Sequence, residues 1–122
     1  MAKLHISLVR MSHPDALTST PRATPIGTPE VITTSPASQT STLAATAALL
    51  AGTTTAATAA GNPAGSARVC WRLANTGAED VVVQFGSAPT ATQTADFMVL
   101  ADSVAYFAVG AAGEKVAVIN VL

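Results

Sequence analysis

From residue 68 onward the sequence is built of short segments in which apolar and polar residues alternate, separated by clusters of glycine, asparagine, serine and proline. Successive side chains of a β-strand point to opposite faces, so this alternation gives each segment one apolar face. Segments this short, bounded by turn residues, are typical of strands rather than helices. The pattern predicts an all-β fold whose core is formed by the apolar faces. The expected core residues are Val69, Trp71, Leu73, Val81, Val83 and Phe85.

The spacing of the segments indicates how they are arranged. Residues 75–78 supply turn chemistry between 68–74 and 80–85, which predicts a β-hairpin. The segments nearest the C-terminus are apolar on both faces, which predicts strands covered by a second sheet on one side and by the arm or another subunit on the other. We expect a small antiparallel β-sandwich of about six strands over residues 38–122, jelly-roll or immunoglobulin-like in kind. The expected strands are 41–45, 68–74, 80–85, 97–100, 104–109 and 115–121.

Five prolines punctuate residues 1–37. Proline fixes φ and lacks an N–H, so neither a helix nor a central strand is expected to run through this stretch. We predict an extended N-terminal arm over residues 1–37, with a disordered terminus as the alternative. An arm has little surface of its own, so its apolar side chains are expected to pack on another molecule, at about 1.5 to 3 kcal/mol each. These partner-contact residues are Leu4, Ile6, Leu8, Val31 and Ile32.

Charge is scarce in this chain: 11% of residues are charged, and the formal net charge is −1. Binding to phosphate backbones needs clustered Lys and Arg, so nucleic acid is not expected as a partner. Residues 31–67 carry no charge at all, but threonine, serine, glycine and proline interrupt them before the ~18 consecutive apolar residues of a membrane span are reached. A surface with so few charges favours contact with other chains. We therefore expect a homo-oligomer.

The residues that catalysis or metal binding would need are few and far apart. His5 and His13 both lie in the predicted arm, without a rigid scaffold or a second ligand at useful spacing. Cys70 is the only cysteine, which rules out an intrachain disulfide and fits a reducing cytoplasm. Asp96 and Asp102 flank a predicted strand, but no calcium-loop pattern accompanies them. We therefore expect no catalytic site, metal or cofactor.

The predicted hairpin carries the remaining polar candidates. Glu79 and Asp80 are consecutive, so on a strand they would point to opposite faces and could not act as paired carboxylates. Arg72 is expected to pair with one of them across the hairpin, or with an acidic group of a neighbouring chain. Trp71 is in phase with the apolar face and is expected in the core; the alternative is an exposed platform for a sugar ring.

Three stretches of the sequence resemble a known family. They read RVCWRLANTG (68–77), VVVQFG (81–86) and MVLADSVAYF (98–107). In this order, and joined by a Thr-rich loop, they resemble small β-sandwich virion proteins of tailed bacteriophages. The resemblance covers about residues 38–122, and the chain departs from it through the Ala/Thr-rich segment 49–66 and the proline-rich arm.

The resemblance implies a non-enzymatic capsid cement or decoration protein, which stabilises the head by bridging capsomers. Its partner would be the major capsid protein, its commonest oligomer a homotrimer, and its location the virion, assembled in the host cytoplasm. Alternatives are a head-fibre, tail or head-to-tail connector component, or a glycan-binding module using Trp71 or Tyr106. A trimer on the capsid surface favours a cement protein, whereas a sixfold or twelvefold ring favours a connector.

Overall fold

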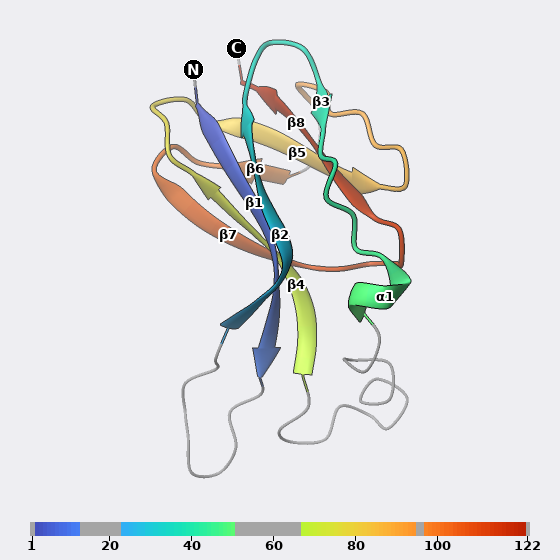
Figure 1. Cartoon of the computed structure of the whole chain (residues 1–122). Coiled ribbons are helices and arrows are strands. Elements are labelled where there is room, and N and C mark those ends of the chain that lie inside the picture. The colour runs from blue at the N-terminus through green and yellow to red at the C-terminus, as the bar shows by residue number, and fades with distance from the viewer. Residues whose placement is uncertain (1, 13–22, 51–66, 95–96, 122) are drawn as a thin grey trace.

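Two antiparallel sheets packed face to face make up the fold (Figure 1). The computed structural model describes residues 2–12, 23–50, 67–94 and 97–121. Within these ranges there are eight strands and a four-residue helix, so the predicted all-β antiparallel sandwich is confirmed. The elements are β1 (Lys3–Ser12), β2 (Ala23–Thr33), β3 (Gln39–Thr40), α1 (Ala47–Leu50), β4 (Ala67–Asn75), β5 (Val81–Gly86), β6 (Phe97–Val99), β7 (Ser103–Ala108) and β8 (Lys115–Asn120). The described residues contain no helix that could span a membrane.

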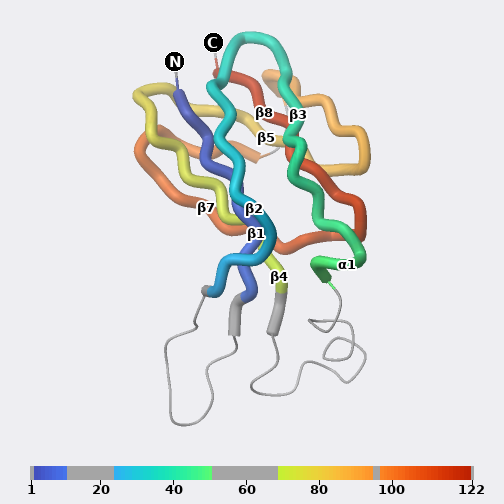
Figure 2. The backbone as a smooth tube through the Cα atoms, viewed as in Figure 1, coloured from blue at the N-terminus to red at the C-terminus, as the bar shows by residue number. Residues whose placement is uncertain are grey.

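The strand order is that of a jelly roll, with β1 in the place of the last strand. One sheet has the order β2-β1-β4-β7 and the other β3-β8-β5-β6. Counted from β2 round to β1, the first and last strands are neighbours, as in the double Greek key of a jelly roll. Residues near both ends of the chain bond to the segment after β2: Thr34 N donates to Ala2 O (2.9 Å), and Asn120 N donates to Ser35 O (3.0 Å). Figure 2 shows both ends at the top of the sandwich.

The first strand is the main correction to the sequence-based interpretation. β1 lies between β2 and β4 and pairs with both, so it is a central strand and not an arm. The side chains of Leu4, Ile6 and Leu8 are 0% exposed and belong to the core, and Ile32 is buried with them. Their expected contact with a partner chain is therefore wrong, because the chain's own second sheet covers them. Of the five predicted contact residues, Val31 alone is exposed, at 52%.

The prolines exert their effect on β2 rather than on β1. No proline falls within β1, whereas Pro25 and Pro29 fall within β2, which is an edge strand. Edge strands are where proline is tolerated, because a missing N–H there need not break a ladder on both sides. Around Gly27, at φ +70°, the pairing with β1 shifts register. The stretch that contains Pro25 and Pro29 is therefore a bulged edge strand, not a detached segment.

The predicted hairpin of 68–74 and 80–85 does not form. β4 and β5 lie in different sheets, and the residues between them cross from one sheet to the other. Asn75 organises this crossing: its buried Nδ2 donates to Glu79 O (2.7 Å) and Val99 O (3.2 Å), and its Oδ1 accepts from Gly77 N (3.1 Å). A Cβ on Gly77 would lie 2.4 Å from the Cα of Ala2. The glycine is needed for this close approach, which couples the crossing to the start of β1.

The predicted core residues lie between the sheets. Val69, Trp71, Leu73, Val81 and Val83 are buried in one cluster. The sixth, Phe85, is partly buried, and its ring packs against those of two other phenylalanines at 5.8 and 5.1 Å. These contacts join faces of both sheets, which is the arrangement that the period-two alternation predicted.

A second apolar cluster lies on the outer face of the β3-β8-β5-β6 sheet. Val82, Ala117 and Ile119 are buried there together with Ala91, which comes from the chain that follows β5. Ala91 N donates to Ser38 Oγ (2.9 Å), which ties this chain over the sheet. The apolar outer residues of β5 and β8 are thus covered in part by the protein itself, whereas the sequence had predicted another subunit or the arm.

Substitution of Ile6 by Asp tests whether β1 is part of the core. The buried side chain is replaced by an unpaired charge, so we expect the free energy of unfolding to fall by more than about 3 kcal/mol. Val31→Asp, on the exposed position of the neighbouring strand, is the matched control and should change it by less than about 0.5 kcal/mol. Urea unfolding followed by circular dichroism measures both. If Ile6→Asp unfolds at the same urea concentration as the wild type, β1 is not part of the core and the prediction of an arm stands.

Candidate functional site

Trp71 is a structural residue rather than an exposed platform. It is 0% exposed, and its Nε1 donates a hydrogen bond to Oε1 of Glu114 at 2.8 Å. The same carboxylate accepts from Gly110 N at 3.2 and 3.3 Å, so it holds the connection between β7 and β8. A buried indole N–H needs an acceptor, and here the acceptor also fixes a turn. The interpretation of Trp71 as a sugar platform is wrong.

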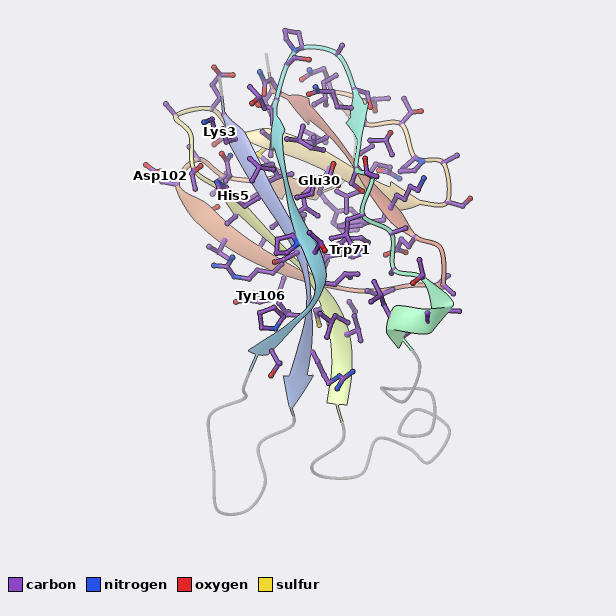
Figure 3. All side chains as sticks on the ribbon, in the orientation of Figure 1. Lys3, His5, Glu30, Trp71, Asp102 and Tyr106 are labelled. Atoms are coloured by element: carbon purple, nitrogen blue, oxygen red, sulfur yellow. The ribbon has the colours of Figure 1, made fainter. Side chains whose placement is uncertain are left out.

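A second carboxylate also binds backbone N–H groups. Glu30, on β2, accepts from Thr42 N and Leu43 N, each at 2.8 Å from Oε1 (Figure 3 labels Glu30). This ties the edge strand to the segment that leads into α1. Neither Glu30 nor Glu114 was predicted as a structural residue from the sequence. The available signal was an acidic residue at the border of a long uncharged stretch, since such a residue must be solvated or bound to backbone donors.

The other chemical candidates do not come together. His5 Nε2 lies 3.2 Å from Thr76 Oγ1, and Cys70 is half-buried on β4. Asp80 Oδ1 accepts from Ala101 N at 2.8 Å, in the turn before β7. Among the described residues there is no group of three His, Cys, Asp or Glu that could hold a metal ion.

Four further candidate residues from the sequence analysis remain to be placed. His13 and Asp96 lie outside the described residues. Asp102 is exposed, with φ +52°, a left-handed conformation that Asp tolerates in a turn. The pairing of Arg72 with an acid across the hairpin loses its basis, because that hairpin does not form.

A hollow lies on the outer face of the β2-β1-β4-β7 sheet. Its volume is about 380 Å³. His5 and Ser7 of β1, Arg72 of β4 and Tyr106 of β7 line it; His5 and Tyr106 are labelled in Figure 3. The remaining lining residues are Ile6, Val9, Pro25, Pro29, Glu30 and Val31. Pro25 and Pro29, on either side of the register shift of β2, form part of its wall.

The most distinctive surface is what we call the β6–β7 edge. It consists of large apolar side chains that are between 44% and 56% exposed: Phe97, Met98, Leu100, Val104 and Tyr106. β6 is the last strand of one sheet and β7 the last strand of the other, so within the described residues no further strand covers this side of the sandwich. Along β7 exposure alternates, with Val104 and Tyr106 exposed and Ala105 and Phe107 packed against the core.

Comparisons of the chain with protein-family models, with curated proteins and with solved structures found no match. The fold and these two surfaces are therefore the basis on which a function can be proposed.

Removal of the Glu114 carboxylate tests the clamp on Trp71. Glu114→Ala leaves the buried indole N–H without its acceptor, so we expect the free energy of unfolding to fall by about 1–3 kcal/mol. Glu114→Gln keeps a side-chain oxygen in the same place and should lose less than half of that. Thermal unfolding compares the two variants. Equal losses would show that the charge, and not the acceptor, matters.

Proposed function

We propose that this chain is a non-enzymatic structural protein that binds other protein chains through the β6–β7 edge. In its particular form, the proposal is a capsid cement protein of a tailed bacteriophage, which binds the major capsid protein and bridges capsomers. The bridging part is then the β6–β7 edge, since the described strands of the predicted arm, β1 and β2, belong to the sandwich.

One observation carries the proposal. Of the six large hydrophobic side chains that are exposed in the described part of the chain, five belong to the β6–β7 edge. Exposed hydrophobic residues scattered singly need no explanation, but five within one short stretch of the chain, 97–106, favour a part of the surface that binds protein or ligand. Asp102 is the one charged residue of 97–113, so a partner meets almost no charge that would have to be desolvated.

The fold and the resemblance support the particular form of the proposal. Jelly rolls build many viral capsid domains, although lectins and cupins use them too, so the fold narrows the role without choosing it. The stretches that resemble phage virion proteins are residues 68–77, 81–86 and 98–107, which contain β5 and most of β4 and β7. Many copies on a lattice would turn the modest area of one edge into strong attachment.

Two alternatives differ in what they require. A connector or fibre component would use the same edge within a ring, so electron microscopy of the assembled particle, by its symmetry, separates it from a cement protein. A glycan-binding module now depends on Tyr106, which is 49% exposed beside the hollow, because Trp71 is buried. Tyr106→Ala would then abolish glycan binding, whereas the attachment to protein would depend on several apolar residues.

Leu100→Asp tests the proposed attachment. Leu100 is the most exposed apolar residue of the β6–β7 edge, at 56%, so the substitution should leave the fold intact. We expect its affinity for emptied heads of the phage that encodes the chain to be at least about tenfold weaker, since a buried leucine is worth about 1.5–3 kcal/mol and tenfold corresponds to about 1.4. Co-sedimentation of protein with heads measures the affinity.

Val31→Asp is the matched control, because Val31 is exposed to a similar degree on the opposite edge. It should bind heads like the wild type. Failure of the wild-type protein to bind, or equal loss in both variants, would refute the proposal.

A further inference from the structure

We propose that β7 pairs with β7 of a second copy of this chain, antiparallel and around a two-fold axis at Tyr106. The two β2-β1-β4-β7 sheets would then form one continuous sheet of eight strands. This inference deepens the proposed function, because it assigns the β7 part of the β6–β7 edge to self-association and leaves the β6 side for the larger particle.

Comparison of the four sheet edges singles out β7. The edge at β2 carries Pro25, Pro29 and a bulge, which hinder addition of a strand. β3 has two residues and β6 has three, too few for a stable ladder. β7 has six residues in regular register with β4, and it contains no proline, glycine or charged residue. Natural edge strands are usually protected by such residues, so their lack on β7 favours an edge that is covered in the assembly.

The hydrogen-bond pattern shows which backbone groups face outward. Val109 N donates to Val69 O at 3.3 Å, and the register pairs Phe107 with Trp71 and Ala105 with Leu73. In an antiparallel ladder, hydrogen-bonded and non-hydrogen-bonded pairs alternate, so every second residue of β7 bonds to β4. The N–H and C=O groups of the others point to the open edge. These outward-facing residues are Val104, Tyr106 and Ala108.

The pattern of outward-facing groups allows few registers between β7 and β7 of a second copy. Outward-facing residues must pair with outward-facing residues, and the register that uses the whole of 103–109 places Tyr106 opposite Tyr106 of the second copy. Val104 then lies opposite Ala108, a larger side chain beside a smaller one. Val104 and Tyr106 are both about half exposed in the single chain. In the dimer, these side chains of one copy would cover those of the other copy on one face of the joined sheet.

Charge favours an identical partner. Residues 103–113 contain no Asp, Glu, Lys or Arg, so a strand paired with its own copy brings no like charges together. A partner strand rich in Lys or Glu would instead bury its charges against Tyr106 and Val104 without ionic partners. The neutral, self-complementary edge therefore points to a second copy as the occupant.

Sedimentation equilibrium tests the pairing. The wild-type chain should have twice its 12.2 kDa mass at micromolar concentration. Tyr106→Lys places two lysines opposite each other at the axis, and we expect it to weaken dimerisation at least tenfold. Val31→Lys is the matched control, since Val31 is exposed to a similar degree on the other edge of the same sheet; it should stay dimeric. A monomeric or trimeric wild type, or a Tyr106→Lys variant that dimerises normally, would overturn the inference.

Disulfide trapping tests the register independently of the lysine variant. In a Cys70→Ser background, chains with Val104→Cys mixed with chains with Ala108→Cys should form a disulfide-linked dimer under mild oxidation. The Cα atoms of a hydrogen-bonded pair lie about 5.5 Å apart, within the range of disulfides. Each variant alone should cross-link far less, because the axis at Tyr106 does not bring like positions together. Efficient cross-linking of Val104→Cys alone, or none in the mixture, would reject this register.

The two proposals fail separately. If Leu100→Asp loses binding to heads and remains a dimer, the attachment surface and the pairing of β7 are both supported as distinct surfaces. If Tyr106→Lys is monomeric and still binds heads as a single copy with the wild-type intrinsic affinity, self-pairing stands and the attachment is assigned to the β6 side. Head binding by a wild-type protein that is a monomer at all concentrations would overturn the pairing alone.

Discussion

The structure depends on β1, the strand that lies between β2 and β4. Through Leu4, Ile6 and Leu8 it contributes three fully buried side chains to the face between the sheets. It also closes the topology, because it takes the place of the last jelly-roll strand while standing first in the chain. The contacts of Ala2 with Thr34 and of Lys3 O with Thr76 N show that the start of β1 also fixes the loops at that end of the sandwich. Without this strand β2 would have no partner on that sheet, and β4 would become an edge.

Once β1 closes one sheet, the distribution of edges explains the surface. The β2 edge is bulged and bound through Glu30 to the segment before α1, and Glu114 ties the connection after β7 to the buried Trp71. In the part of the chain that the structure describes, the opposite side, formed by β6 and β7, has no comparable cover, and it carries most of the exposed large apolar side chains. The chain has few charged side chains that could keep this side in contact with water. The proposed contacts with other chains therefore follow from the shortage of charge in the sequence.

The sequence predicted the strands better than their partners. The segments with alternation became β4 to β8 within a residue or two, and Val69, Trp71, Leu73, Val81 and Val83 are buried as expected. The pairing of β4 with β5 was wrong, because turn residues indicate that the chain reverses but not whether it returns in the same sheet. The apolar alternation of residues 4–8 is typical of a strand, but the prolines that follow it predicted an extended arm for the whole of 1–37. Of the candidate surface, Val104 and Tyr106 could be placed on one face of a strand, but their exposure depended on β7 being the last strand of its sheet.

What the sequence determined by itself is therefore the all-β class, the positions of most strands and the apolar face of each, because a period of two residues is a local property of extended backbone. What only the tertiary structure decided is which strands are neighbours: that β1 is central, that β4 and β5 are in different sheets, and that β6 and β7 are edges. Pairing joins residues far apart in the chain, and its free energy comes from backbone hydrogen bonds that are nearly the same for any two strands. The choice among partners is made by packing of the complete sandwich, which no short stretch of sequence contains.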